Sequence, residues 1–229
     1  MAGTFPGGVL RFHSWWPSGR NQSHELAQQG LNLNRISMSN AVASYVHFMC
    51  AALLKFRQTG AIVPSQRFLI SKMITPVPET YSGRIIELGA GNGALTLRLA
   101  ARCPKARILA CEINPVLARK TRENLDRAGI NGQVKVVSDS AEHLLSEMGR
   151  RGMDHVDFVL SGIPLGNLPG EQVQALIDTI CGALRPGGMY IQFQYSLIDR
   201  KRIRSRFRLL RTCPVVLNVP PAVVYYAQK

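Results

Sequence analysis

Short apolar segments alternate with helical patterns from Arg84 to Tyr195, and this alternation constrains the fold more than any other feature of the chain. The apolar segments have the length of strands and are 84–90, 106–113, 132–139, 156–163 and 189–195. The segments between them have helical patterns and are 94–101, 115–128, 141–148 and 172–184. Repeated strand–helix–strand order predicts an α/β protein, in which helices cover both faces of a mostly parallel sheet.

A glycine-rich loop follows the first predicted strand, in the sequence IIELGAGNGALTLRLA from Ile85 to Ala100. Because Gly89, Gly91 and Gly93 lack a Cβ, the backbone can turn sharply there and come close to a ligand. Ligands bind open parallel sheets at the carboxyl ends of the strands, where this loop lies. The spacing G-x-G-x-G differs from the G-x-G-x-x-G of dinucleotide-binding proteins, and an acid, Glu87, precedes the loop.

Two further acids lie at the ends of the next two predicted strands. Glu112 ends the second strand, where a carboxylate can accept hydrogen bonds from both hydroxyls of a ribose. Asp139 ends the third strand and is placed to meet an adenine amino group. A surface Glu and a helix N-cap Asp are the structural alternatives for these two acids. Their position after consecutive strands favours a nucleoside site.

These motifs resemble a known family. IIELGAGNGALT, ACEINP and SDSAEHL resemble class I S-adenosylmethionine-dependent methyltransferases, over roughly residue 60 to the end of the chain. The resemblance implies a Rossmann-like, seven-stranded sheet that ends in an antiparallel hairpin, which we assign to the runs 215–219 and 222–227. It also implies S-adenosylmethionine as the cofactor. The predicted cofactor-binding residues are Glu87, Gly89, Ala90, Gly91, Asn92, Gly93, Glu112, Ile113, Asp139, Ser140, Ala141 and Ser161.

A closer resemblance involves four other segments. TGAIVPSQRFLISKMI, VDFVLSGIPLGNLP, GGMYIQFQYS and LNVPPAVVYYAQ resemble the bacterial phosphatidylethanolamine N-methyltransferases, with departures at Gln66, Ile163 and Gln194. The resemblance implies methyl transfer to the amine of phosphatidylethanolamine, toward phosphatidylcholine. Tyr195 is the predicted catalytic residue, facing the head group through cation–π attraction and its hydroxyl. The predicted substrate-binding residues are Tyr45, Ile163, Pro164, Leu165, Tyr195 and Asn218.

Two alternative functions compete with lipid methylation. RNA adenine methyltransferases have N-[IL]-P-[YF] after the fourth strand, where the Asn polarises the amine and the aromatic side chain stacks on the base. This chain has Ser161-Gly162-Ile163-Pro164-Leu165 there and lacks both groups. The other alternative is a lipid-binding scaffold that keeps the fold without turnover.

The net charge of the chain suggests where the enzyme acts. The 28 Lys and Arg against 14 Asp and Glu give a formal charge of +14, and six of nine residues in 200–208 are basic. An anionic partner is therefore expected, with a membrane surface and its phospholipids favoured over nucleic acid. We predict a cytoplasmic protein, peripherally associated with the inner face of the cell membrane.

The chain is divided into residues 1–58, an N-terminal arm with an amphipathic helix within 37–56, and residues 59–229, the methyltransferase domain. The helix predicted within 37–56 either packs on the domain or enters a membrane interface. The five cysteines are scattered, so no metal site is expected. His143 and His155 show no partner pattern and are interpreted as ordinary polar residues.

Overall fold

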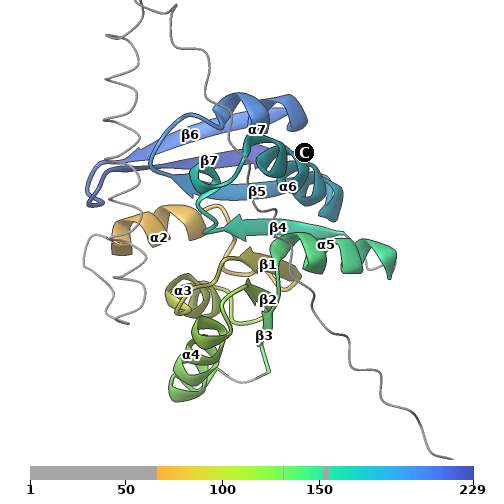
Figure 1. The fold of residues 1–229 in the computed structure, drawn as a ribbon. Coiled ribbons are helices and arrows are strands. Elements are labelled where there is room, and N and C mark those ends of the chain that lie inside the picture. Colours follow the sequence, from red (N-terminus) through yellow and green to blue (C-terminus); the bar gives the residue numbers. More distant parts are fainter. Residues whose placement is uncertain (1–65, 131, 152–154) are drawn as a thin grey trace, which may run out of the picture. The chain divides into compact units, whose positions relative to one another are not determined.

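A computed structural model describes residues 66–130, 132–151 and 155–229 (Figure 1). In this part of the chain seven strands form one sheet with the order β3-β2-β1-β4-β5-β7-β6. Five strands are parallel: β1 (Arg84–Leu88), β2 (Arg107–Glu112), β3 (Val134–Ser138), β4 (Val156–Ser161) and β5 (Leu184–Gln194). The strand β7 (Ala222–Gln228) runs antiparallel to both β5 and β6 (Leu209–Val215). This topology confirms the predicted mostly parallel sheet with a terminal hairpin.

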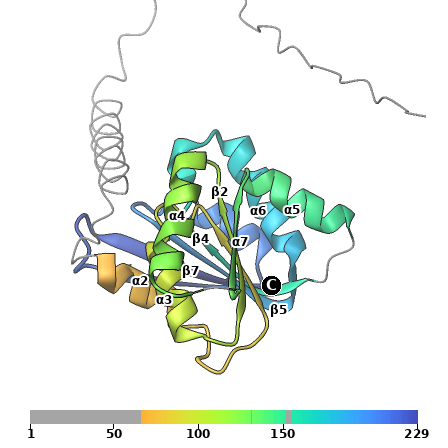
Figure 2. The same cartoon turned by 90° about the horizontal axis from the view of Figure 1, so that it is seen from below.

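Helices cover both faces of the sheet (Figure 2). One layer contains α2 (Gln66–Ile74), α3 (Ala94–Arg102) and α4 (Pro115–Arg127). The other contains α5 (Ala141–Arg150), α6 (Gly170–Ala183) and α7 (Arg200–Arg206), and a short 3-10 turn, η1 (Leu165–Asn167), precedes α6. The basic segment 200–208 contains α7.

The strand β1 shows how one segment serves both cores. Side chains alternate along a strand, so Ile85 packs in the core under α2 and α3, while Ile86 and Leu88 pack in the core under α5 and α6. Glu87 has the same parity as Ile85, and it is buried with 1% exposure. Its carboxylate therefore belongs to the α2–α3 side of the sheet.

Helix caps fix the chain where it leaves the second and third strands. Asn114 is the N-cap of α4, and its side chain accepts hydrogen bonds from the backbone N–H groups of Val116 and Leu117, while Pro115 occupies the first turn. Ser140 caps α5 in the same way by accepting from the backbone N–H of His143. Both helices therefore start directly at the carboxyl edge of the sheet.

Two predicted strand positions were wrong. The strand β5 begins at Leu184 instead of residue 189, because a register shift against β4 between Val156 and Phe158 accommodates the Pro-Gly-Gly sequence. The strand β6 is Leu209–Val215 instead of 215–219. Residues 216–221 form the turn, since two prolines there lack the N–H that a sheet ladder needs.

Three predictions lie outside the described residues: the domain boundary at 58/59, the amphipathic helix within 37–56, and the substrate contact of Tyr45. Within the described residues, no helix combines the length and apolar character that crossing a membrane requires.

Candidate functional site

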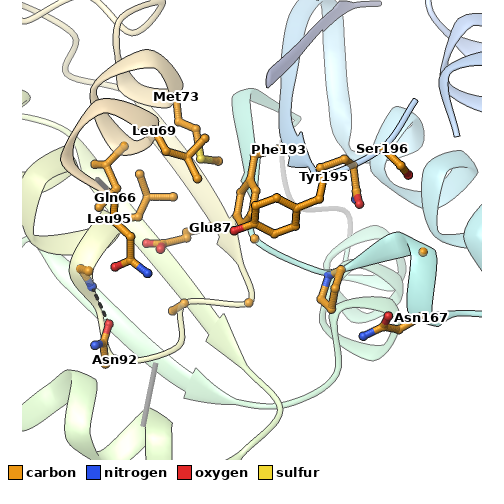
Figure 3. A pocket seen from close by; sticks show the side chains of 18 residues that line it. Gln66, Leu69, Met73, Glu87, Asn92, Leu95, Asn167, Phe193, Tyr195 and Ser196 are labelled. Atoms are coloured by element: carbon orange, nitrogen blue, oxygen red, sulfur yellow. Dashed lines mark hydrogen bonds between the residues drawn. The ribbon is translucent and has the colours of Figure 1, made fainter. Parts of the chain in front are cut away.

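A pocket opens at the carboxyl edge of the sheet, between α2, the loop after β1, the loop after β4 and the end of β5 (Figure 3). Its walls are mostly apolar, with a few polar side chains, as is typical of small-molecule sites. The residues that line it are Gln66, Leu69, Ile70, Met73, Glu87, Gly89, Ala90, Asn92, Ala94, Leu95, Gly162, Pro164, Gly166, Asn167, Phe193, Gln194, Tyr195 and Ser196.

The loop after β1 requires glycine at two positions. Gly89 has φ +74° and Gly93 has φ +83°, a region that residues with a Cβ rarely adopt. A Cβ on Gly89 would lie 3.2 Å from Cγ1 of Ile163, and one on Gly93 would lie 2.8 Å from Cγ2 of Thr121. The loop thus passes close to both the β4 loop and α4. Its residues Gly89, Ala90 and Asn92 line the pocket.

Glu112 holds this loop through its carboxylate. Its Oε2 accepts a hydrogen bond of 2.7 Å from the backbone N–H of Gly91, and its Oε1 accepts one of 3.0 Å from the N–H of Asn114. Each carboxylate oxygen can accept more than one bond, so the predicted ribose contact fits this fixed and buried group. The exposed Ile113 follows it directly, at the edge of the predicted nucleoside site.

Two residues of α4 support the loop and were missed from the sequence. The hydroxyl of Thr121 donates to the carbonyl oxygen of Gly91 at 2.8 Å, and the amide of Asn124 donates to the carbonyl oxygen of Asn92 at 2.9 Å. The spacing of i and i+3 places both side chains on one face of the helix. Polar residues on the sheet-facing side of α4 were the signal that a sequence search could have used.

Asp139 lies where predicted, at the end of β3, but it has a partner that was not predicted. Its Oδ2 lies 2.7 Å from Nδ1 of His143, and its Oδ1 accepts from the backbone N–H of Ser140 at 2.8 Å. The hydrogen bond with His143 holds the pKa of Asp139 below its usual value. The interpretation of His143 as a residue without a partner was therefore wrong, and the i, i+4 spacing across the start of α5 was the missed signal.

The other predicted cofactor residues lie around this edge. Ala90 and Asn92 line the pocket, and Ala141 is buried at the start of α5. Ser161 is fully buried at the end of β4, where its hydroxyl accepts from the backbone N–H of Ile163 at 3.2 Å. The nearby thiol of Cys111 has its pKa raised to about 12 by burial, so it is a thiol rather than a nucleophilic thiolate at neutral pH.

The predicted substrate residues separate into two groups. Pro164 and Tyr195 line the pocket, and Ile163 lies against the glycine loop. Leu165 is fully buried in the core under α5 and α6, and Asn218 lies in the β6–β7 turn, where its amide donates to the carbonyl of Pro220 at 2.6 Å. Neither of these two is among the residues that line the pocket, so any effect they have on a substrate acts through packing.

Two aromatic side chains, Phe193 near the end of β5 and Tyr195 directly after it, form one wall of the pocket. The rings of Phe193 and Tyr195 meet edge to face, with centroids 5.7 Å apart and an interplanar angle of 81°. Glu87 faces the same cavity, and Leu69 and Met73 of α2 lie opposite (Figure 3). The sequence predicted Tyr195 but missed Phe193, although their i, i+2 spacing on a strand predicts a common face.

Two glutamines of β5 fix the carbonyl of Ile163. Nε2 of Gln192 donates to this oxygen at 2.9 Å, and Nε2 of Gln194 donates to it at 3.3 Å. A carbonyl oxygen has two lone pairs, so both are engaged within the protein. The backbone of the β4 loop is therefore held in place and does not offer this acceptor to a substrate amine.

In the described part of the chain, no group of three His, Cys, Asp or Glu side chains is placed to hold a metal ion.

Comparison with known proteins places the site in context. Residues 85–188 match the family model described as a methyltransferase domain. An ornithine lipid N-methyltransferase from Singulisphaera acidiphila is 28% identical over 172 residues, which are 74% of this chain and 88% of that protein. A ribosomal protein L11 methyltransferase from Pelotomaculum thermopropionicum is 30% identical over 123 residues, which are 54% of this chain but 34% of that protein.

A solved structure shares the fold. The SAM-dependent methyltransferase from Agrobacterium tumefaciens superposes with a TM-score of 0.60 at 14% identity, over 73% of this chain and 63% of that chain. At this identity the likeness is evidence for the fold alone, and it confirms the predicted Rossmann-like methyltransferase architecture.

Proposed function

We propose that this chain is an S-adenosylmethionine-dependent methyltransferase and that it methylates the amine of phosphatidylethanolamine, toward phosphatidylcholine; the match of residues 85–188 to a methyltransferase domain supports the first part. The proposal rests on one observation: Glu87, Phe193 and Tyr195 face a single, largely apolar pocket beside the glycine loop (Figure 3). A buried carboxylate and aromatic rings suit cationic groups, and a lipid ammonium and a sulfonium are both cations.

The cofactor has a consistent set of ligands in this chain. When bound, S-adenosylmethionine supplies an electrophilic methyl group on a positively charged sulfur. Glu112 and Asp139 would hold its nucleoside, while the loop from Gly89 to Gly93 and the buried Glu87 would surround its methionine part. Gly89 and Ala90 line the pocket, so the methionine part would lie on the pocket side of this loop.

The substrate amine has to lose a proton before it can attack. With a lysine-like pKa near 10.4, deprotonation at pH 7 costs about 4 to 5 kcal/mol. A desolvated site can lower an amine pKa by roughly 3 to 5 units, so apolar walls can supply much of this cost. In this pocket Leu69, Ile70, Met73 and Phe193 exclude water from the amine. The amine then gives its proton to bulk water on entering the site, so a dedicated base is unnecessary and positioning dominates.

Tyr195 and Gln194 would orient the amine. The ring of Tyr195 attracts the ammonium, and this attraction persists in the quaternary product, which has no N–H left. Since Nε2 of Gln194 donates to the carbonyl of Ile163, its Oε1 is the atom of that amide that can accept an N–H from the substrate. Removal of the last N–H would end this interaction and favour product release.

Ornithine lipid is a second candidate substrate, because the relative from Singulisphaera acidiphila is named for it. RNA adenine is disfavoured, since residues 161–165 at the end of β4 contain no Asn and no aromatic side chain, and the carbonyl of Ile163 is already engaged by Gln192 and Gln194. We further propose that the enzyme acts at the anionic inner face of the cell membrane, consistent with its formal charge of +14.

Label transfer from methyl-labelled S-adenosylmethionine tests the proposal. The protein is incubated separately with vesicles of phosphatidylethanolamine plus an anionic lipid, vesicles of ornithine lipid plus the same anionic lipid, and RNA. We expect label in phosphatidylethanolamine. Label in ornithine lipid alone would mean that ornithine lipid, and not phosphatidylethanolamine, is the substrate. Label in RNA alone would refute lipid methylation, and label in none of the three would favour a lipid-binding scaffold without turnover.

A further inference from the structure

Six large apolar side chains are exposed around the pocket, and together they are called the apolar rim. Their exposed fractions lie between 50% and 72%. They are Phe68, Leu197, Ile198, Val216, Leu217 and Val219. Single exposed apolar residues are common on protein surfaces, but a group of this size at one edge marks an interaction site.

The three segments of the apolar rim meet at the carboxyl edge of the sheet. Phe68 belongs to α2, whose other face lines the pocket, and Leu197 follows Ser196, which also lines it. The β6–β7 turn begins beyond the pair Val215↔Ala222, and these two residues pack in one core with Leu69 and Ile70 of α2. Both views show this turn beside α2 (Figures 1 and 2).

Local structure fixes the outward direction of these side chains. In the turn, Asn218 is buried and its amide is bonded to the carbonyl of Pro220, so its neighbours Leu217 and Val219 remain outside. After β5, Asp199 and Ile203 are buried, while Leu197 and Ile198 are exposed. The rim is therefore a consequence of ordered backbone in both segments.

Cations lie next to the apolar rim. Arg200 and Lys201 are exposed and follow Leu197 and Ile198 directly. Within residues 66–130, 132–151 and 155–229 neither of them forms a salt bridge, whereas two other arginines of the same segment do: Arg202 pairs with Asp199 and Arg206 pairs with Asp178. Apolar side chains beside uncompensated positive charges match the interface of an anionic bilayer, which offers acyl chains below a layer of phosphates.

We propose that the apolar rim enters the interfacial region of an anionic membrane, while Arg200 and Lys201 bind lipid phosphates. This inference rests on the proposed function in one respect: a rim beside the pocket lets a lipid amine move from the bilayer into the site without leaving the membrane. It assigns membrane contact to the methyltransferase domain itself, at residues distinct from the helix predicted within 37–56.

The test measures vesicle binding of the full chain with two variants, Leu197→Ser/Ile198→Ser and Val216→Ser/Leu217→Ser. Leu209→Ser is the matched control, because Leu209 is also exposed but starts β6 at the opposite edge, paired with Gln228. With vesicles of phosphatidylethanolamine and phosphatidylglycerol, we expect each double variant to bind about tenfold more weakly, equivalent to about 1.4 kcal/mol. The control should bind like the wild type. Equal binding of all four proteins, or no binding by the wild type, overturns the proposal.

Two further measurements distinguish insertion of the apolar rim into the membrane from other causes of weaker vesicle binding. In a chain with Trp15→Phe and Trp16→Phe, Leu217→Trp should fluoresce from an aqueous environment, then shift to the blue and be quenched when vesicles with brominated acyl chains are added. A blue emission before vesicles are added would mean that protein already covers the rim, and would refute the proposal.

Turnover of monomeric, short-chain phosphatidylethanolamine by the double variants should equal that of the wild type. If the wild type binds vesicles through the rim but methylates no lipid, the proposed function fails while the membrane surface stands.

Discussion

Replacing Glu112 with glutamine tests the cofactor site at the residue that connects most of its parts. The carboxylate accepts from the backbone N–H of Gly91 at 2.7 Å and from that of Asn114 at 3.0 Å. In the amide one oxygen becomes an NH₂ group, which cannot accept either bond. Glu112→Gln thus keeps the size of the side chain but leaves one backbone N–H facing a donor.

The size of the effect follows from these bonds. A hydrogen bond to a charged group contributes about 1.5 to 3 kcal/mol, against about 1 kcal/mol for a neutral one. Loss of one acceptor and of the charge at a ribose contact should therefore weaken S-adenosylmethionine binding by about 2 to 3 kcal/mol, which is roughly 30- to 150-fold in Kd. Because the two loop bonds exist within the protein itself, folding is affected as well. A loss of about 1 kcal/mol lowers Tm by about 2 to 4 °C for a domain of this size.

Isothermal titration calorimetry with S-adenosylmethionine and thermal melts give the two readouts. Glu142→Gln is the control, since Glu142 is exposed at the start of α5 and the change in net charge is the same. We expect its affinity and Tm to match those of the wild type. If Glu112→Gln binds the cofactor as tightly as the control, the ribose assignment is wrong. A lower Tm with unchanged affinity would restrict Glu112 to holding the loop.

Three other predictions concern the pocket and one ion pair. Gly89→Ala and Gly129→Ala both place a Cβ at positive φ, at a cost of roughly 1 to 2 kcal/mol each, but only the Cβ at position 89 would meet Ile163. Cofactor affinity measured by calorimetry should therefore fall for Gly89→Ala alone. Equal affinities of the two variants would contradict the close approach of Gly89 to Ile163. Tyr195→Ala should lower kcat/KM for phosphatidylethanolamine by up to about 30-fold at unchanged cofactor affinity, while Tyr195→Phe keeps most activity; wild-type kinetics of the alanine variant would remove Tyr195 from the site. Arg206 holds the pKa of Asp178 below its usual value, so this pair stabilises the fold above about pH 4 and its contribution is lost as pH falls further. Arg206→Ala should lower stability only slightly at pH 7, because both side chains are partly exposed, and by less as the pH falls below about 4; a difference in chemical denaturation that stays constant between pH 7 and pH 3 would refute this assignment.

Local patterns predicted the fold because they agree with one another. The apolar runs 84–90, 106–113 and 132–139 contain the strands β1, β2 and β3, and the helices predicted to begin at residues 115 and 141 begin there. Glycine spacing and strand ends then placed the cofactor loop and the acids at one edge, since parallel strands share a direction.

Predictions failed where distant residues decide the outcome. The predicted position of β6 was wrong because LLRTCPV is only partly apolar. In the structure the pairing of this segment with β7 outweighs the higher β propensity of the residues that follow it. The support of the loop by Thr121 and Asn124 depends on how α4 packs beside it. The engagement of the Ile163 carbonyl by Gln192 and Gln194 depends on the register of β4 and β5. None of these contacts is local in sequence.

A crystal structure with S-adenosylhomocysteine and a phosphoethanolamine head group tests the central claim most directly, namely that one pocket at the carboxyl edge holds both the methyl donor and a lipid amine. We predict the ribose hydroxyls on Glu112, the sulfur on the pocket side of the loop at Gly89, and the amine against the ring of Tyr195. Nucleoside density away from Glu112, or an amine bound outside the cavity between Glu87 and Tyr195, would contradict the account.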